Sequence, residues 1–87
     1  MDILDALSRK SREAGLRFLV IGGHAVIAHG HPRFTKDLDL LVCKTDREQW
    51  ISLLGDLGFP LWRDGGIFLQ FQPPSEDEWP IDLMLVI

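Results

Sequence analysis

The sequence has a single cysteine and no long apolar run. One cysteine excludes an internal disulfide framework and indicates a reducing compartment. The first ten residues carry acidic side chains where a secretory signal needs basic ones, and no apolar stretch approaches the length that crosses a bilayer. We therefore expect a cytoplasmic protein that has no membrane partner.

Basic residues are also scarce. Nine Lys and Arg against thirteen Asp and Glu give a net charge of −4, which argues against a protein that coats nucleic acid by bulk charge. Residues 45–87 carry a charge of −6, whereas residues 22–44 sum to +1 and contain all three histidines. An anionic ligand is therefore expected at residues 22–44.

The length of 87 residues leaves room for one small domain, 1–87, with a thin margin of stability. A hydrophobic content of 46% and a charged content of 25% are typical of a globular chain. The last apolar strand has no covering helix after it. We expect a minimal or truncated core that is completed by a homodimer or by a partner protein.

The periodicity of apolar residues predicts an α/β (α+β) fold with a mixed sheet and helices packed on it, in the order α-β-α-β-α-β-β-β. Helices are expected at 2–15, 24–29 and 45–58, the last opened by a capping box at Thr45 and Glu48. Strands are expected at 16–21, 37–43 and 81–87, together with a hairpin over 60–72 that turns at 64–66.

Two glycines, Gly22 and Gly23, join the first strand to the expected second helix. Without Cβ atoms, the backbone at this turn can approach a ligand closely, and the N–H groups that open a helix bind anions. Considered alone, the pair is better explained by a tight turn that needs positive φ and holds no ligand.

Asp37 and Asp39 lie two residues apart in the apolar strand 37–43. Side chains alternate along a strand, so the two carboxylates project from one face, about 7 Å apart along the chain. Two charges in an apolar strand are costly without compensation, and a divalent cation with oxygen ligands would supply it. The alternative is a strand-start cap for Asp37 and a surface ion pair for Asp39.

A third carboxylate, Asp82, lies within the last apolar strand. An unpaired carboxylate there would be expensive to bury. The alternative is an exposed position at the start of the strand, directly after Pro80.

Together, these features resemble the nucleotidyltransferase superfamily related to DNA polymerase β. The matching segments are Ile-Gly-Gly at 21–23, Asp-Leu-Asp-Leu at 37–40 and Ile-Asp-Leu at 81–83, and the resemblance spans residues 16–87. More narrowly, residues 22–42 look like bacterial nucleotidyltransferase-like proteins of the abortive-infection and toxin–antitoxin type. The second turn position is Gly23, where many active members have serine.

The resemblance implies a two-metal mechanism with Mg²⁺ or Mn²⁺ as cofactor. Asp37 and Asp39 would hold the metals, and Asp82 would ligate the metal nearer the attacking hydroxyl and favour its deprotonation. Gly22 and Gly23 would present backbone N–H groups to the triphosphate.

Basic residues and histidines near this region are further candidates. Arg33 and Lys36 could neutralise the triphosphate or pair with acids, and His24 could touch a phosphate. A zinc site at His29 and His31 lacks further ligands at suitable spacing. Trp62 and Trp79 could mark an interface or a base-stacking surface, or they could pack in the core.

We therefore expect an enzyme of the nucleotidyltransferase type. It would transfer a nucleoside monophosphate from a nucleoside triphosphate such as ATP to a hydroxyl of a protein, an RNA or a small molecule. The alternative is a catalytically silent nucleotide-binding or partner-binding module of a toxin–antitoxin system.

Overall fold

The computed structural model describes residues 3–22, 26–27, 34–35, 37–76 and 78–87. The main elements in chain order are α1 (Ile3–Ala14), β1 (Phe18–Gly22), β2 (Val26–Ile27), β3 (Phe34–Thr35), β4 (Leu38–Cys43), the 3₁₀ turn η1 (Lys44–Asp46), α2 (Arg47–Asp56), β5 (Leu61–Asp64), β6 (Phe68–Phe71) and β7 (Ile81–Val86). Most of these elements lie where the apolar pattern predicts them.

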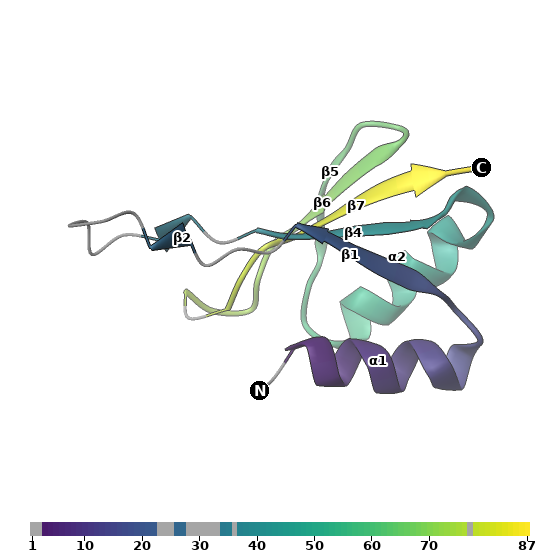
Figure 1. Cartoon of the computed structure of the whole chain (residues 1–87), viewed down its shortest axis with the longest axis horizontal. Coiled ribbons are helices and arrows are strands. Elements are labelled where there is room, and N and C mark those ends of the chain that lie inside the picture. The colour runs from purple at the N-terminus through teal and green to yellow at the C-terminus, as the bar shows by residue number, and fades with distance from the viewer. Residues whose placement is uncertain (1–2, 23–25, 28–33, 36, 77) are drawn as a thin grey trace.

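Five of the described strands form one mixed sheet in the order β1-β4-β7-β6-β5 (Figure 1). The central pair, β4 and β7, is parallel, and every other pair in this sheet is antiparallel. The predicted α+β class and mixed sheet are confirmed. The short β2–β3 pair is separate and projects beyond the ends of β1 and β4 (Figure 1).

Both α1 and α2 lie on the same side of the sheet (Figure 1). Their apolar stripes pack against alternate residues of the central strands, so the core is a single layer between helices and sheet. The fully buried side chains include Leu7 of α1, Trp50 and Leu54 of α2, and Leu40 and Leu83 of the two central strands. Phe18 packs edge-on against Trp50, with ring centroids 5.7 Å apart.

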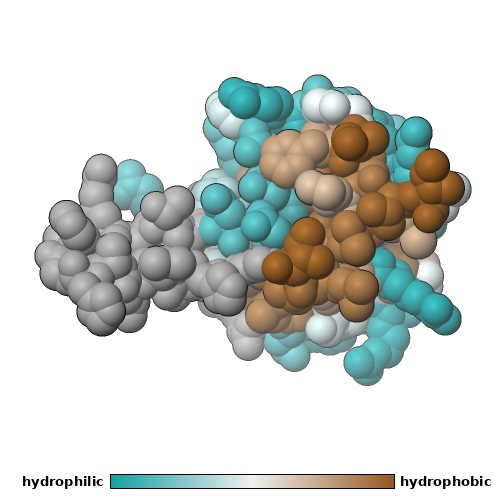
Figure 2. Space-filling view, turned by 45° about the horizontal axis from the view of Figure 1, so that its top comes forward, coloured by the Kyte–Doolittle hydropathy of each residue, from teal (hydrophilic) through white to brown (hydrophobic). Residues whose placement is uncertain are grey.

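The opposite face of the sheet, which we call the open face, is covered by none of the described elements. Register aligns an apolar row across it, formed by Leu19, Leu41, Met84 and Phe68 on β1, β4, β7 and β6. Leu19 is 64% exposed, and apolar side chains gather on one side of the molecule (Figure 2). This face is therefore available for contacts beyond the chain's own core.

The prediction of a helix over 24–29 is wrong at Val26 and Ile27. These two residues form β2, paired with Phe34 and Thr35 of β3. Val and Ile are β-branched, so they favour extended backbone, and their antiparallel partners lie only nine and seven residues further along the chain. The rest of the predicted helix lies outside the described residues.

The predicted capping box at Thr45 and Glu48 does not form. Residues 44–46 make the 3₁₀ turn η1, so α2 begins at Arg47, and within the described residues neither Cys43 nor Asp46 makes a side-chain capping hydrogen bond. Arg47 pairs instead with Glu48 and with Asp64 at the end of β5. This ion pair links the start of α2 to the β5–β6 hairpin.

Shortening a leucine side chain to alanine should change the free energy of unfolding differently on the two faces of the sheet. Leu54→Ala should lower the free energy of unfolding by about 2–5 kcal/mol, because it leaves a cavity beneath a fully buried side chain. Leu19→Ala, on the open face, should change it by less than about 0.5 kcal/mol. Urea denaturation of both variants checks this. A large loss in Leu19→Ala would mean that the open face is covered in solution.

Candidate active site

A single row of aligned residues crosses all five strands of the sheet. Gly22 pairs with Asp39, Asp39 with Asp82, Asp82 with Gln70, and Gln70 with Arg63. Side chains at aligned positions share a face, and the flanking residues Leu40 and Leu83 point into the core. The sheet therefore brings Asp39 and Asp82 together on the open face, with Gly22 on one side and Gln70 on the other.

Asp37 joins these two carboxylates from the residue before β4. The backbone N–H of Leu38 donates to the carbonyl of Pro80 at 2.9 Å, which holds the start of β4 against the start of β7. A hollow of about 210 Å³, which we call the carboxylate hollow, is lined by Asp37, Asp39 and Asp82 with Ile21, Leu40, Phe68 and Met84. The three carboxylates singled out in the sequence therefore line one hollow, and their role as a site stays a prediction.

Asp82 is a carboxyl group whose pKa is shifted, and burial is the main cause of the shift. Only 9% of the residue is exposed, because apolar neighbours surround it on the sheet. Loss of hydration is the largest cause, and together with the charges of Asp37 and Asp39 it raises the pKa of Asp82 to about 6. A hydrogen bond from protonated Asp82 to the carboxylate of Asp39 also raises this pKa, whereas the side-chain amide of Gln70 lowers it. The site therefore concentrates negative charge that no basic side chain among the described residues compensates.

The remaining predicted residues divide into two groups. Gly22 is the last residue of β1 and lies beside Asp39 in the row. The predicted contacts of Gly23, His24, Arg33 and Lys36 lie outside the described residues. They therefore stay predictions.

Oxygen donors of this kind suit Mg²⁺, which prefers carboxylate ligands and keeps several waters. Their mutual repulsion is the condition that a divalent cation relieves. In the described part of the chain, however, no group of three or more His, Cys, Asp or Glu side chains is arranged as a metal site. The donor set therefore fits Mg²⁺ by its chemistry and by its shared hollow, and the side chains would have to turn toward the ion.

Two residues near the carboxylates were not predicted as part of the site. Gln70 is the polar residue in the otherwise apolar strand Phe68–Phe71, a signal that sequence inspection could have used. Trp62 was considered only as a stacking or packing residue. It lies in a second hollow of about 330 Å³ that also reaches Asp37 and Asp82.

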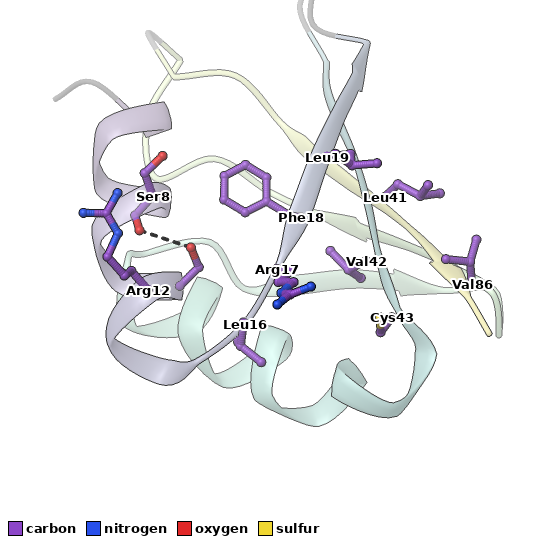
Figure 3. A pocket seen from close by; sticks show the side chains of 11 residues that line it. Ser8, Arg12, Leu16, Arg17, Phe18, Leu19, Leu41, Val42, Cys43 and Val86 are labelled. Atoms are coloured by element: carbon purple, nitrogen blue, oxygen red, sulfur yellow. Dashed lines mark hydrogen bonds between the residues drawn. The ribbon is translucent and has the colours of Figure 1, made fainter.

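A larger cavity lies elsewhere, along the edge strand β1 (Figure 3). Its volume is about 690 Å³, and its lining combines apolar residues such as Leu16 and Leu41 with Arg12 and Arg17. Ser11 at its wall donates to the carbonyl of Ser8 at 3.2 Å. None of the carboxylates of the row reaches it, so size alone does not identify the reactive site.

Comparisons with known proteins support the fold. No family model and no curated protein matches this chain. Among solved structures, the antibiotic-resistance factor ANT(2'')-Ia matches with a TM-score of 0.70 and 17% identity over 95% of this chain and 44% of its own. The lincomycin-bound lincosamide antibiotic adenylyltransferase LnuA matches with a TM-score of 0.68 and 15% identity over 94% of this chain and 52% of its own.

The chain therefore shares the fold of these two structures, one of which is an adenylyltransferase, in line with the fold that the resemblance in sequence implied. The chain spans about half the length of these two structures. The narrower toxin–antitoxin likeness stays a prediction. No helix in the described ranges is long and apolar enough to cross a membrane.

The raised pKa of Asp82 predicts a pH-dependent loss of stability in metal-free buffer. In the unfolded chain the pKa of this carboxyl group is 3.8, so the folded state binds the proton more tightly. The free energy of unfolding therefore falls as the pH rises from about 4 to 6. Asp82→Asn should remove that loss and raise the free energy of unfolding at pH 7 by on the order of 3 kcal/mol.

Urea denaturation between pH 4 and 8 in the presence of EDTA measures the effect. The matched control is Glu76→Gln, which removes one charge from an exposed loop and should leave the pH profile unchanged. A less stable Asp82→Asn variant at pH 7 would contradict the electrostatic account.

Proposed function

We propose that this chain is the catalytic core of a Mg²⁺-dependent nucleotidyltransferase. The observation that carries the proposal is the register of β1, β4 and β7, in which Gly22, Asp39 and Asp82 are successive partners. A glycine backbone beside two carboxylates is suited to a triphosphate that is held together with a divalent cation. The likeness in fold to an adenylyltransferase supports ATP as the first nucleotide to test.

The reaction balances as a single displacement. The oxygen of an acceptor hydroxyl forms a bond to the α-phosphorus, and the bond from that phosphorus to the oxygen bridging to the β-phosphate breaks. Pyrophosphate leaves with the electron pair, and the hydroxyl proton passes to the carboxylate of Asp82. The product is the acceptor esterified with a nucleoside monophosphate.

Each residue contributes by position. Asp37 and Asp39 would hold the divalent cation, which when bound neutralises the triphosphate and polarises the reacting phosphate. Gly22, with no side chain, leaves the backbone open to phosphate oxygens beside Asp39. Because the carboxylates are mounted on the two central strands, the sheet fixes their separation before substrate arrives.

A second candidate is a nucleotide-binding module without turnover. The observation that favours it is that no three of the described side chains form a ready metal site. Such a module would bind ATP with Mg²⁺ and release it unchanged. Transfer of label from [α-³²P]ATP separates the two functions, because only the enzyme attaches the labelled phosphate to an acceptor.

Asp39→Asn should weaken the binding of ATP in the presence of Mg²⁺ by at least about tenfold, equivalent to 1.4 kcal/mol. Isothermal titration calorimetry measures this. The direction of the change in ATP affinity tests the mechanism. If no cation joined the carboxylate to the triphosphate, removing this negative charge near a polyanion would strengthen binding. Glu76→Gln is the matched control and should bind as the wild type does.

For transfer of label, Asp39→Asn and Asp82→Asn should each lower the rate by at least about a hundredfold. Lincomycin is one acceptor to include, because it is bound to LnuA in the matching structure. Equal ATP binding by the wild type and Asp39→Asn would contradict the assignment of the carboxylates.

A further inference from the structure

Both outer strands of the five-stranded sheet are bulged where the carboxylate row reaches them. In β1 the register shifts between Val20 and Gly22, which leaves Ile21 as the extra residue. In β5 it shifts between Leu61 and Arg63, which leaves Trp62 as the extra residue. Each bulge brings the residue that follows it, Gly22 or Arg63, into register with the carboxylate row. The extra residues stay on the open face beside that row, where Ile21 lines the carboxylate hollow and Trp62 lines the second hollow.

The second hollow, which we call the Trp62 hollow, begins where the carboxylate hollow ends. The two share Asp37 and Asp82, so the carboxylates lie between them. The Trp62 hollow lies on the side of Asp82 away from Gly22, because β6 and β5 follow β7 in the sheet. Its other lining residues are Gln70, Phe71, Gln72, Pro73 and Pro80.

Trp62 presents an apolar surface that is held in place. Trp62 is 55% exposed, and the guanidinium carbon of Arg63 lies 4.5 Å from the centroid of its ring. This cation–π contact steadies a side chain that would otherwise move freely on an edge strand. An exposed aromatic ring with a polar edge favours flat ligands that carry both apolar and hydroxyl groups.

Gln70, which also lines the Trp62 hollow, has a side-chain oxygen that can accept a hydrogen bond. Its Oε1 is buried and has no hydrogen-bond partner among the described residues. Gln70 is the register partner of Asp82, and the lowering of the Asp82 pKa by its side-chain amide places the N–H donor on that carboxylate. The amide oxygen therefore awaits a donor, and a buried acceptor without one is costly.

We propose that the Trp62 hollow binds the acceptor substrate, a small hydroxylated ring compound that packs on Trp62 and donates a hydrogen bond to Gln70 Oε1. The role as acceptor rests on the proposed nucleotidyl transfer. Among the described residues, Asp37 and Asp82 are the charged ones that line this hollow, so it favours neutral or cationic rings over anions.

The test uses the full ¹⁵N-labelled chain and three simple rings of different charge. Glucosamine, methyl α-glucoside and glucuronate are each titrated to about 50 mM, a range suited to millimolar affinities. The indole N–H of Trp62, identified by its absence in Trp62→Phe, and the side-chain amide of Gln70 are followed by NMR. We expect both signals to shift, with affinity in the order glucosamine, methyl glucoside, glucuronate.

Two substitutions test whether Trp62 and Gln70 contact the sugar. Trp62→Ala removes an exposed side chain and should weaken glucosamine binding at least about tenfold without loss of the fold. Gln70→Leu should have a similar effect. Its matched control is Gln49→Leu, the same change at an exposed position on α2, which should bind as the wild type does.

Several results would overturn the proposal. These are no shift of the Trp62 indole with any of the three rings, unchanged affinity in Trp62→Ala, or a shift of that indole by ATP with Mg²⁺, which would make the ring a nucleobase platform. ATP binding without sugar binding would overturn the Trp62 hollow and leave nucleotidyl transfer standing. Sugar binding in a chain that does not bind ATP would keep the hollow and overturn the transfer.

Discussion

The parallel pairing of β4 with β7 is the interaction on which the rest of the structure depends. Leu40 and Leu83 face one another across it on the helix side, and Asp39 and Asp82 do so on the open side. The same register that closes the core therefore forces two carboxylates together. The hydrogen bond from Leu38 to Pro80 fixes that register at its beginning. A slip of one residue would bury the acids and expose the leucines.

Sequence reasoning could recover most elements because apolar periodicity is local information. The alternation in residues 38–42 and 81–85 places the strands, and the stripe of Trp50 and Leu54 places α2. Which strand lies next to which is decided by contacts far apart in sequence. The carboxylates were predicted as a group only through a resemblance that had already assembled them, while Gln70, whose place follows from the β6–β7 register, was missed.

The local errors have a common physical origin. Val26 and Ile27 fit a short helix by length, yet a β-branched pair accepts an antiparallel partner when one is near. Thr45 and Glu48 have the spacing of a capping box, yet Arg47 makes ion pairs with Glu48 and Asp64, and the chain enters α2 through a 3₁₀ turn. In both cases a tertiary or neighbouring interaction replaced the local preference.

The bulges at Ile21 and Trp62 mean that the reactive row and its surroundings can change separately. An extra residue in an edge strand is absorbed where it occurs, so the two central strands keep their alignment. Substitution or insertion at Trp62 would reshape the wall of one hollow and leave the spacing of Asp39 and Asp82 intact. A sheet built in this way can alter what it recognises at its margins while its centre stays fixed, which is a route by which one fold can serve many ligands.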